Sequence, residues 1–215
     1  MSERQIFHWF QGLGWLVFSG GADPYGEIRG KAIARGSADG AVVCIALTNE
    51  PNTADQLLDD VEDLGAQTGY IVDLNTEDDV TLQQRIGEAG VIVFYSDYAP
   101  EEIRSALLGA ALSGIQTAYQ NGAVILLEGT TAMAFGNLMY TRDGEIQQGL
   151  DWLENALIIS PINNVAEYSR DFLSKNPAYF SIGIGVGSAL ALGPNNEVEV
   201  WGERKITVAL GAAYQ

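Results

Sequence analysis

The chain has 215 residues, of which 47% are hydrophobic and only 18% are charged, so we expect a folded globular protein. Its 28 acidic and 11 basic residues give a net charge of −17, which disfavours nucleic acid and anionic membrane surfaces as partners. No apolar run approaches the roughly 20 residues of a membrane span, and the N-terminus lacks the pattern of a secretory signal. We therefore expect a cytoplasmic protein in which residues 15–215 form a single domain.

Residues 1–14 are expected to form a separate N-terminal aromatic helix. Ser2 and Gln5 have the spacing of a capping box. Four large apolar residues follow the cap: Ile6, Phe7, Trp9 and Phe10. Rings of this size must be covered, either by the domain's own surface or by a second copy in a homo-oligomer.

Apolar segments alternate with helical patterns from residue 15 to about residue 138. Strands are expected at 15–19, 41–47, 70–73, 91–95 and 123–128, and helices at about 27–35, 53–64, 76–86, 100–119 and 132–138. Strands that alternate with helices of about ten residues imply right-handed crossovers and a mainly parallel sheet. The sequence therefore predicts a three-layer α/β/α sandwich.

The last third of the chain has a shorter periodicity. A strand at 157–159 and a helix at 164–174 precede closely spaced strands at 181–186, 189–192, 198–201 and 206–210. Brief turns between such strands favour antiparallel pairing. We expect these strands to form an antiparallel C-terminal extension of the sheet.

The chain offers few metal or cofactor ligands. It has one cysteine, Cys44, inside an apolar strand, and one histidine, His8, so a zinc site is not expected. The segment that begins at Asp73 lacks the glycine and the glutamate of a calcium loop and is interpreted as a helix start. The glycines of residues 182–187 come late and precede no helix, unlike a dinucleotide-binding loop. We expect neither a metal nor a cofactor.

The strand at 123–128 runs into a helical pattern through Gly129, Thr130 and Thr131. This outline is that of a nucleophile elbow, in which a hydroxyl or thiol sits on a tight turn at the carboxyl end of the sheet. The hydroxyl at this position is expected to be that of Thr131. Asp97 and Glu128 should lie at the same edge, as a carboxylate pair, as ligands of a cation, or as solvated loop acids.

The order of these features resembles peptidase E and cyanophycinase, serine hydrolases with a fold similar to class I glutamine amidotransferases. The resemblance covers about residues 15–210. It rests on the glycine turn after the first strand, on Gly129–Ala134 against a Gly-Thr-Ser-Ala-Gly-Ala stretch, on Gly149-Leu150, and on residues 183–190. It implies a flavodoxin-like sheet and a peptidase ancestry.

The departures from the family pattern fall where the chemistry would be. By this alignment Thr131 replaces the nucleophilic serine, and Met133 replaces the glycine two residues later. The catalytic histidine of the family falls on or next to Pro161, and its late Asp-Glu pair becomes Gly185-Val186. The loop that builds the oxyanion site reads Tyr95-Ser96-Asp97.

Two functions follow from the resemblance. The favoured one is a catalytically degenerate relative that acts as a binding or assembly protein, with a small peptide or amino-acid-like ligand near Tyr95, Ser96, Asp97, Glu128 and Thr130. The alternative is an active hydrolase of aspartyl peptides or related amides that uses Thr131 as its nucleophile. A threonine hydroxyl needs a base to remove its proton, and the family's base and orienting acid are missing from their expected positions.

Overall fold

The computed structural model describes residues 6–21, 23–37 and 40–214. Its centre is a seven-stranded sheet in the order β11-β10-β1-β5-β4-β2-β3. The strands are β1 (Trp15–Ser19), β2 (Val42–Leu47), β3 (Gly69–Ile71), β4 (Val91–Ser96), β5 (Val124–Gly129), β10 (Ser188–Leu192) and β11 (Val198–Gly202). The first five are parallel to one another, whereas β10 pairs antiparallel with both β1 and β11. The mainly parallel sheet with an antiparallel extension is confirmed.

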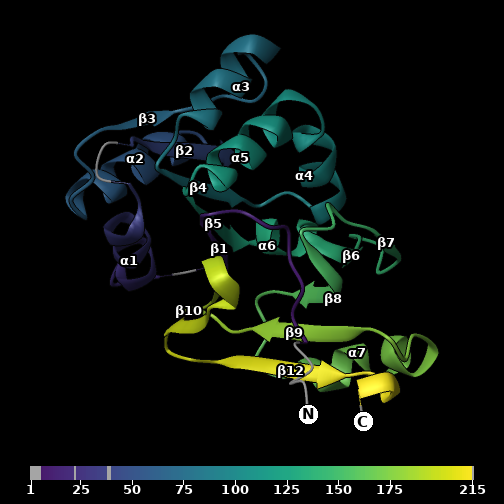
Figure 1. Cartoon of the computed structure of the whole chain (residues 1–215). Coiled ribbons are helices and arrows are strands. Elements are labelled where there is room, and N and C mark those ends of the chain that lie inside the picture. The colour runs from purple at the N-terminus through teal and green to yellow at the C-terminus, as the bar shows by residue number, and fades with distance from the viewer. Residues whose placement is uncertain (1–5, 22, 38–39, 215) are drawn as a thin grey trace.

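Helices cover both faces of this sheet (Figure 1). On one face lie α1 (Glu27–Arg35) and α2 (Thr53–Asp63), and on the other α3 (Asp79–Gly87), α4 (Pro100–Leu107), α5 (Ala110–Gln120) and α6 (Thr130–Ala134). Because side chains alternate along a strand, Val124 and Leu126 of β5 pack towards α1 and α2, while Ile125 and Leu127 pack towards the other helices. The expected α/β/α layers are therefore present.

A second sheet of five strands, in the order β12-β9-β8-β6-β7, corrects one expectation. It consists of β6 (Gly136–Tyr140), β7 (Ile146–Gln148), β8 (Leu153–Ile159), β9 (Phe180–Ile184) and β12 (Ile206–Leu210), with helix α7 (Val165–Lys175) against it. The strands predicted at 181–186 and 206–210 thus do not extend the main sheet. The helix predicted at 132–138 ends at Ala134, because the chain continues as β6 and pairs with β8.

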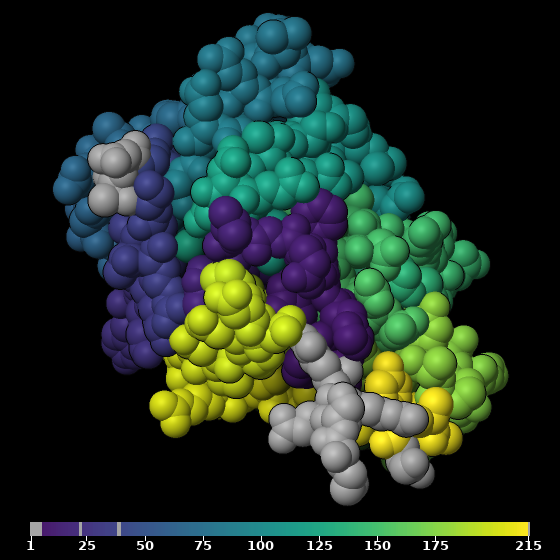
Figure 2. Space-filling view, viewed as in Figure 1, coloured from purple at the N-terminus to yellow at the C-terminus, as the bar shows by residue number. Residues whose placement is uncertain are grey.

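Residues 6–14 form no helix, so the helix predicted there is wrong; residues 1–5 lie outside the described ranges. Trp9 forms an antiparallel bridge with Leu153, and the Phe10 amide donates to the Trp152 carbonyl at 2.8 Å. The Phe10 and Trp152 ring centroids are 5.0 Å apart. Contacts with distant residues therefore decide the conformation. Trp9 is buried and Phe7 and Phe10 pack against the core of the domain, and Figure 2 shows the purple segment lying against the teal and green parts of the chain.

Two smaller differences concern helix ends. The N-cap of α3 is Asp78, whose carboxylate accepts from the amides of Val80 and Thr81, and not Thr76. The long helix predicted at 100–119 is broken into α4 and α5 at Gly109, which has a φ of 110°.

Two short 3₁₀ turns complete the secondary structure, at Pro194–Asn196 and Ala212–Tyr214. Within the described ranges, no helix has both the length and the apolar character needed to cross a membrane.

Candidate functional site at the carboxyl edge of the sheet

The turn between β5 and α6 is built on Gly129. This residue has φ 63° and ψ −123°, and Thr130 is the first residue of the helix. A nucleophile elbow holds its reactive side chain at the sharp turn between strand and helix. Among the described residues, and apart from the two chain neighbours, no atom lies within 4 Å of the place that a Cβ on Gly129 would take. The residue at the sharp turn, where the reactive side chain of an elbow would stand, is therefore a glycine and has no side chain.

Thr131 lies inside the protein and is fully buried. Its hydroxyl contacts two backbone carbonyls, donating to Glu128 at 2.9 Å and facing Phe94 at 3.2 Å. Thr130, which is half-buried, donates to the Ser96 carbonyl at 2.8 Å. Both hydroxyls thus tie the elbow to the end of β4.

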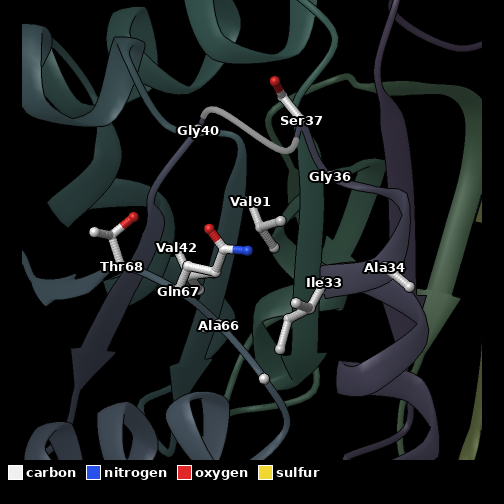
Figure 3. Close-up of a pocket in the computed structure, with 11 residues that line it drawn as sticks. Ile33, Ala34, Gly36, Ser37, Gly40, Val42, Ala66, Gln67, Thr68 and Val91 are labelled. Carbon is white, nitrogen blue, oxygen red and sulfur yellow. The ribbon is translucent and has the colours of Figure 1, made fainter.

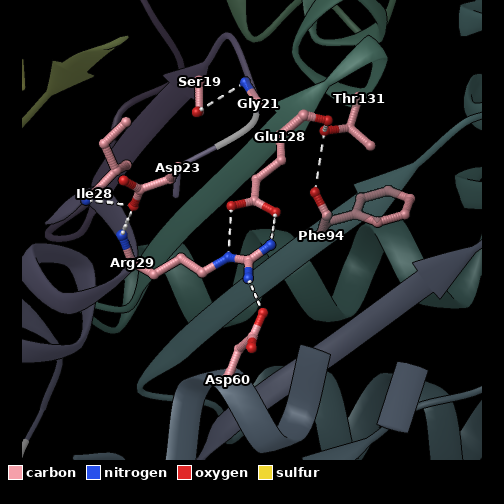
Figure 4. A network of polar contacts seen from close by, with 9 residues as sticks. All are labelled: Ser19, Gly21, Asp23, Ile28, Arg29, Asp60, Phe94, Glu128 and Thr131. Atoms are coloured by element: carbon pink, nitrogen blue, oxygen red, sulfur yellow. Dashed lines mark hydrogen bonds and ion pairs between the residues drawn. The ribbon is translucent and has the colours of Figure 1, made fainter. Parts of the chain in front are cut away.

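Glu128 forms an ion pair that sequence reasoning missed (Figure 4). The alternation of β5 points its side chain towards α1, where Nε and Nη2 of Arg29 donate to the two carboxylate oxygens at 2.9 and 2.7 Å. The Glu128 side chain is only 3% exposed. Arg29 Nη1 also donates to Asp60 of α2 at 2.7 Å, and the Asp60 side chain is 59% exposed. The pair therefore links β5 to both helices of that face.

The charge of Arg29 depends on these partners. Burial lowers the pKa of a guanidinium, but the hydrogen bonds and negative charge of Glu128, with a smaller contribution from Asp60, raise the pKa of Arg29 above its ordinary value. Asp23 fixes the start of α1 by accepting from the amides of Glu27, Ile28 and Arg29 at 2.7–3.2 Å. The cation is thus held in place by its helix and by two acids.

Cys44 of β2 packs into the same layer as α1 and α2. Burial raises the pKa of its thiol to about 12. Because the thiolate is the reactive form, the folded protein should not react with the thiol reagent DTNB at about pH 8. Unfolding in urea should release one reactive thiol per chain. Rapid reaction of the folded protein would contradict the buried position.

The remaining predicted residues gather at the end of β4. Ser96 is buried, and its hydroxyl donates to the Leu47 carbonyl at 2.6 Å. Asp97 is exposed and accepts from the Thr48 hydroxyl at 2.8 Å, so it forms no pair with Glu128. Tyr95 is half-buried and faces α2. The expected residues therefore do converge on one edge, each with its own partner.

Two adjoining cavities open on this edge, and Arg29 and Asp60 line both of them. The first has a volume of about 260 Å³ and is completed by Thr53, Gln56, Leu57 and Tyr95. The second has a volume of about 310 Å³ and is completed by Asp23, Pro24, Tyr25, Gly26, Asp63 and Leu64. We call them together the α1–α2 crevice. Its lining combines one guanidinium, several carboxylates, hydroxyls and an amide, which suits a small polar ligand.

The loops that would carry a catalytic base and acid reach the edge of the sheet beside β1. The Ser160 hydroxyl donates to the Ser19 carbonyl at 3.4 Å, and the Gly185 carbonyl is 2.1 Å from the place a Cβ on Gly20 would take. These loops present Pro161, Gly185 and Val186, none of which can transfer a proton.

His8 lies elsewhere. Its backbone carbonyl accepts from the Glu154 amide at 2.8 Å, near the amino end of β8. Ser160 follows six residues after Glu154, a distance of about 20 Å along an extended strand. The only imidazole of the chain is therefore far from the loop in which the family pattern would place one.

A further cavity of about 190 Å³ lies at the opposite end of the sheet, near the amino ends of β2 and β4 (Figure 3). Its lining includes Val42, Val91, Ile33 and Gln67, and none of the described residues that line it is charged. The described part of the chain contains no group of three or more His, Cys, Asp or Glu residues arranged to hold a metal ion. The carboxyl edge is thus the place where charged and polar groups converge.

Comparisons with known proteins concern the fold. No protein-family model and no curated protein matches the sequence. A peptidase from an acI-B1 actinobacterium superposes with a TM-score of 0.73 at 18% identity, over 93% of this chain and 95% of that one. A protein of Listeria monocytogenes EGD-e assigned to peptidase E superposes with a TM-score of 0.62 at 13% identity, over 87% and 97%.

This chain has the peptidase E fold. The agreement extends over nearly the whole length of both neighbours, so the second sheet belongs to the shared fold. At these identities the likeness establishes the fold alone. Asp23, Arg29 and Asp60 could not be found from the resemblance; the only local signal was an aspartate just before a predicted helix.

Proposed function

We propose that the chain is a catalytically degenerate relative of peptidase E and cyanophycinase that binds a small peptide or amino-acid-like ligand in the α1–α2 crevice. The observation that carries the proposal is the position of Gly129 at the turn of the elbow. A residue without a side chain cannot supply a nucleophile for covalent catalysis. The peptidase E fold supports the proposed ancestry.

The environment of Thr131 also supports the loss of activity. A nucleophilic hydroxyl must reach the substrate and must have a base within hydrogen-bond distance. The Thr131 hydroxyl is buried and its hydrogen-bond partners are the carbonyls of Phe94 and Glu128, which cannot act as general bases. Glu128 itself is neutralised by Arg29. We infer that Thr131 stabilises the elbow and has no catalytic role.

The ligand is proposed to lie beside Tyr95, where Arg29, Gln56 and Thr53 add polar groups. Arg29 uses three of its five N–H groups on Glu128 and Asp60, so two are left to donate to a ligand carboxylate, while Asp60 can accept from the ligand's amino group. The carboxyl edge beside this ligand position is formed by Tyr95, Ser96, Asp97 and Thr130. Glu128 holds Arg29 in position.

Thermal unfolding with aspartyl and arginyl dipeptides and free amino acids tests the binding. At least one of these compounds should raise the Tm, because a ligand that binds only the folded state stabilises it. Tyr95→Ala should reduce the increase, whereas Tyr168→Ala, on the exposed face of α7, should leave it unchanged. Absence of any increase would remove ligand binding from the proposal.

Hydrolysis of aspartyl dipeptides tests the loss of catalysis. Wild-type protein and Thr131→Ala should both show only the uncatalysed rate. Hydrolysis by the wild type that disappears in Thr131→Ala would instead support the active-hydrolase alternative.

A further inference from the structure

Four strands form the edges of the two sheets: β3 and β11 in the main sheet, and β7 and β12 in the second. An edge strand presents unpaired amides and carbonyls, and proteins protect such edges with short strands, charges or proline. β3 and β7 have three residues each. β11 carries Glu199 and lies between Glu197 and Glu203. These three edges are therefore short or acidic.

β12 has none of these features. Its sequence, Ile-Thr-Val-Ala-Leu, contains no charge, proline or glycine and is rich in residues that favour strands. Val208 and Leu210 are 43% and 36% exposed, although both are apolar. β9 pairs with one side of β12, and no strand pairs with its other side in the described part of the chain.

An apolar groove of about 340 Å³ follows the end of this strand. One wall is formed by α7, through Ala166, Arg170, Leu173 and Ser174, and the other by residues 209–212. Ala209 and Leu210 are the last two residues of β12, and Gly211 and Ala212 follow the strand, so the groove lies at its carboxyl end, beside α7. Consecutive residues of a strand point to opposite faces, so a groove that both Ala209 and Leu210 line reaches the edge of β12 at this end.

The charges around β12 differ from those of the chain as a whole. Four of its 11 basic residues lie on α7 or just before β12: Arg170, Lys175, Arg204 and Lys205. Glu167, Asp171 and Glu203 are the acids on the same segments, so these segments carry four positive and three negative charges. In a chain of net charge −17, this is a surface where two copies can approach without strong repulsion.

We propose that β12 pairs antiparallel with β12 of a second copy of this chain, giving a two-fold dimer with one continuous ten-stranded sheet, five strands from each copy. A two-fold axis at Val208 places Val208 opposite its counterpart, Ile206 opposite Leu210 and Thr207 opposite Ala209. The exposed Val208 and Leu210 then form cross-strand apolar pairs. This interface lies on the second sheet and does not depend on the proposed ligand.

Light scattering with size-exclusion chromatography tests the dimer. The wild-type chain should have twice the monomer mass of 23.1 kDa. Val208→Lys should halve the measured mass, because two ammonium groups would face each other on the axis. Val200→Lys, at a 38% exposed position on β11, is the matched control and should remain dimeric. Circular dichroism and Tm should show that both variants fold.

A disulfide provides a second readout. Val208→Cys should form a covalent dimer under mild oxidation, because the two-fold axis brings the two thiols together, and Val200→Cys should not. Cys44 is buried and does not contribute. A wild-type monomer across a broad range of concentration, or a Val208→Lys variant that stays dimeric, would overturn the proposal. A monomer that instead binds an extended peptide along β12 would assign this edge to another partner.

Discussion

Replacing Arg29 with methionine is expected to lower the free energy of unfolding by about 3–5 kcal/mol. The substitution removes the partner of Glu128, whose side chain is 3% exposed and which accepts two hydrogen bonds from the guanidinium. The carboxylate would remain buried without a counter-charge, and such a loss costs far more than an exposed ion pair contributes. Urea unfolding followed by circular dichroism measures the difference.

Two companion variants separate this cause from general loss of packing. Asp60→Asn removes the 59% exposed partner of Arg29 and should cost less than about 1 kcal/mol. The double variant Arg29→Met/Glu128→Leu removes both buried charges and should recover much of the stability lost in Arg29→Met. A double variant no more stable than Arg29→Met would show that packing by the arginine side chain is responsible.

Most strands and helices between residues 15 and 130 follow from local patterns. Apolar runs identified β1, β2, β4 and β5, and the helical spacing between them identified their crossovers. The carboxyl edge could be named as the site because parallel strands end there together. Tyr95, Ser96, Glu128 and Thr130 are indeed found at this edge.

The features that the sequence did not reveal depend on distant partners. Arg29 and Glu128 are 99 positions apart, and no local pattern joins them. Residues 6–14 carry apolar spacing that suits a helix, but their pairing with β8 and their contacts with Trp152 hold them in a non-helical conformation. Closely spaced strands can be recognised in the sequence, yet whether β9 and β12 join the main sheet or form another depends on long-range packing.

The elbow illustrates the same limit. Aligned by its residue types, the turn placed the nucleophile at Thr131, because a serine of the family is replaced by the chemically similar threonine. The backbone places the sharp turn two residues earlier, at Gly129, where φ is 63°. Only the dihedral angles show which residue faces the open space at the turn.

A cysteine at each of these two positions should have opposite reactivities. In Gly129→Cys the thiol would point into open space, so it should react with DTNB at a rate near that of a free thiol. The left-handed backbone there should cost about 1–3 kcal/mol of stability, which the fold should tolerate. In Thr131→Cys the thiol would be buried below the turn and should be as unreactive as Cys44.

The ratio of these two rates, measured in folded protein with the wild type as control, shows whether Gly129 or Thr131 occupies the nucleophile position of the elbow. We expect one rapidly reacting thiol in Gly129→Cys and none in Thr131→Cys or the wild type. A reactive thiol at position 131 together with an unreactive one at position 129 would contradict this expectation, and would return Thr131 to the nucleophile position of the elbow.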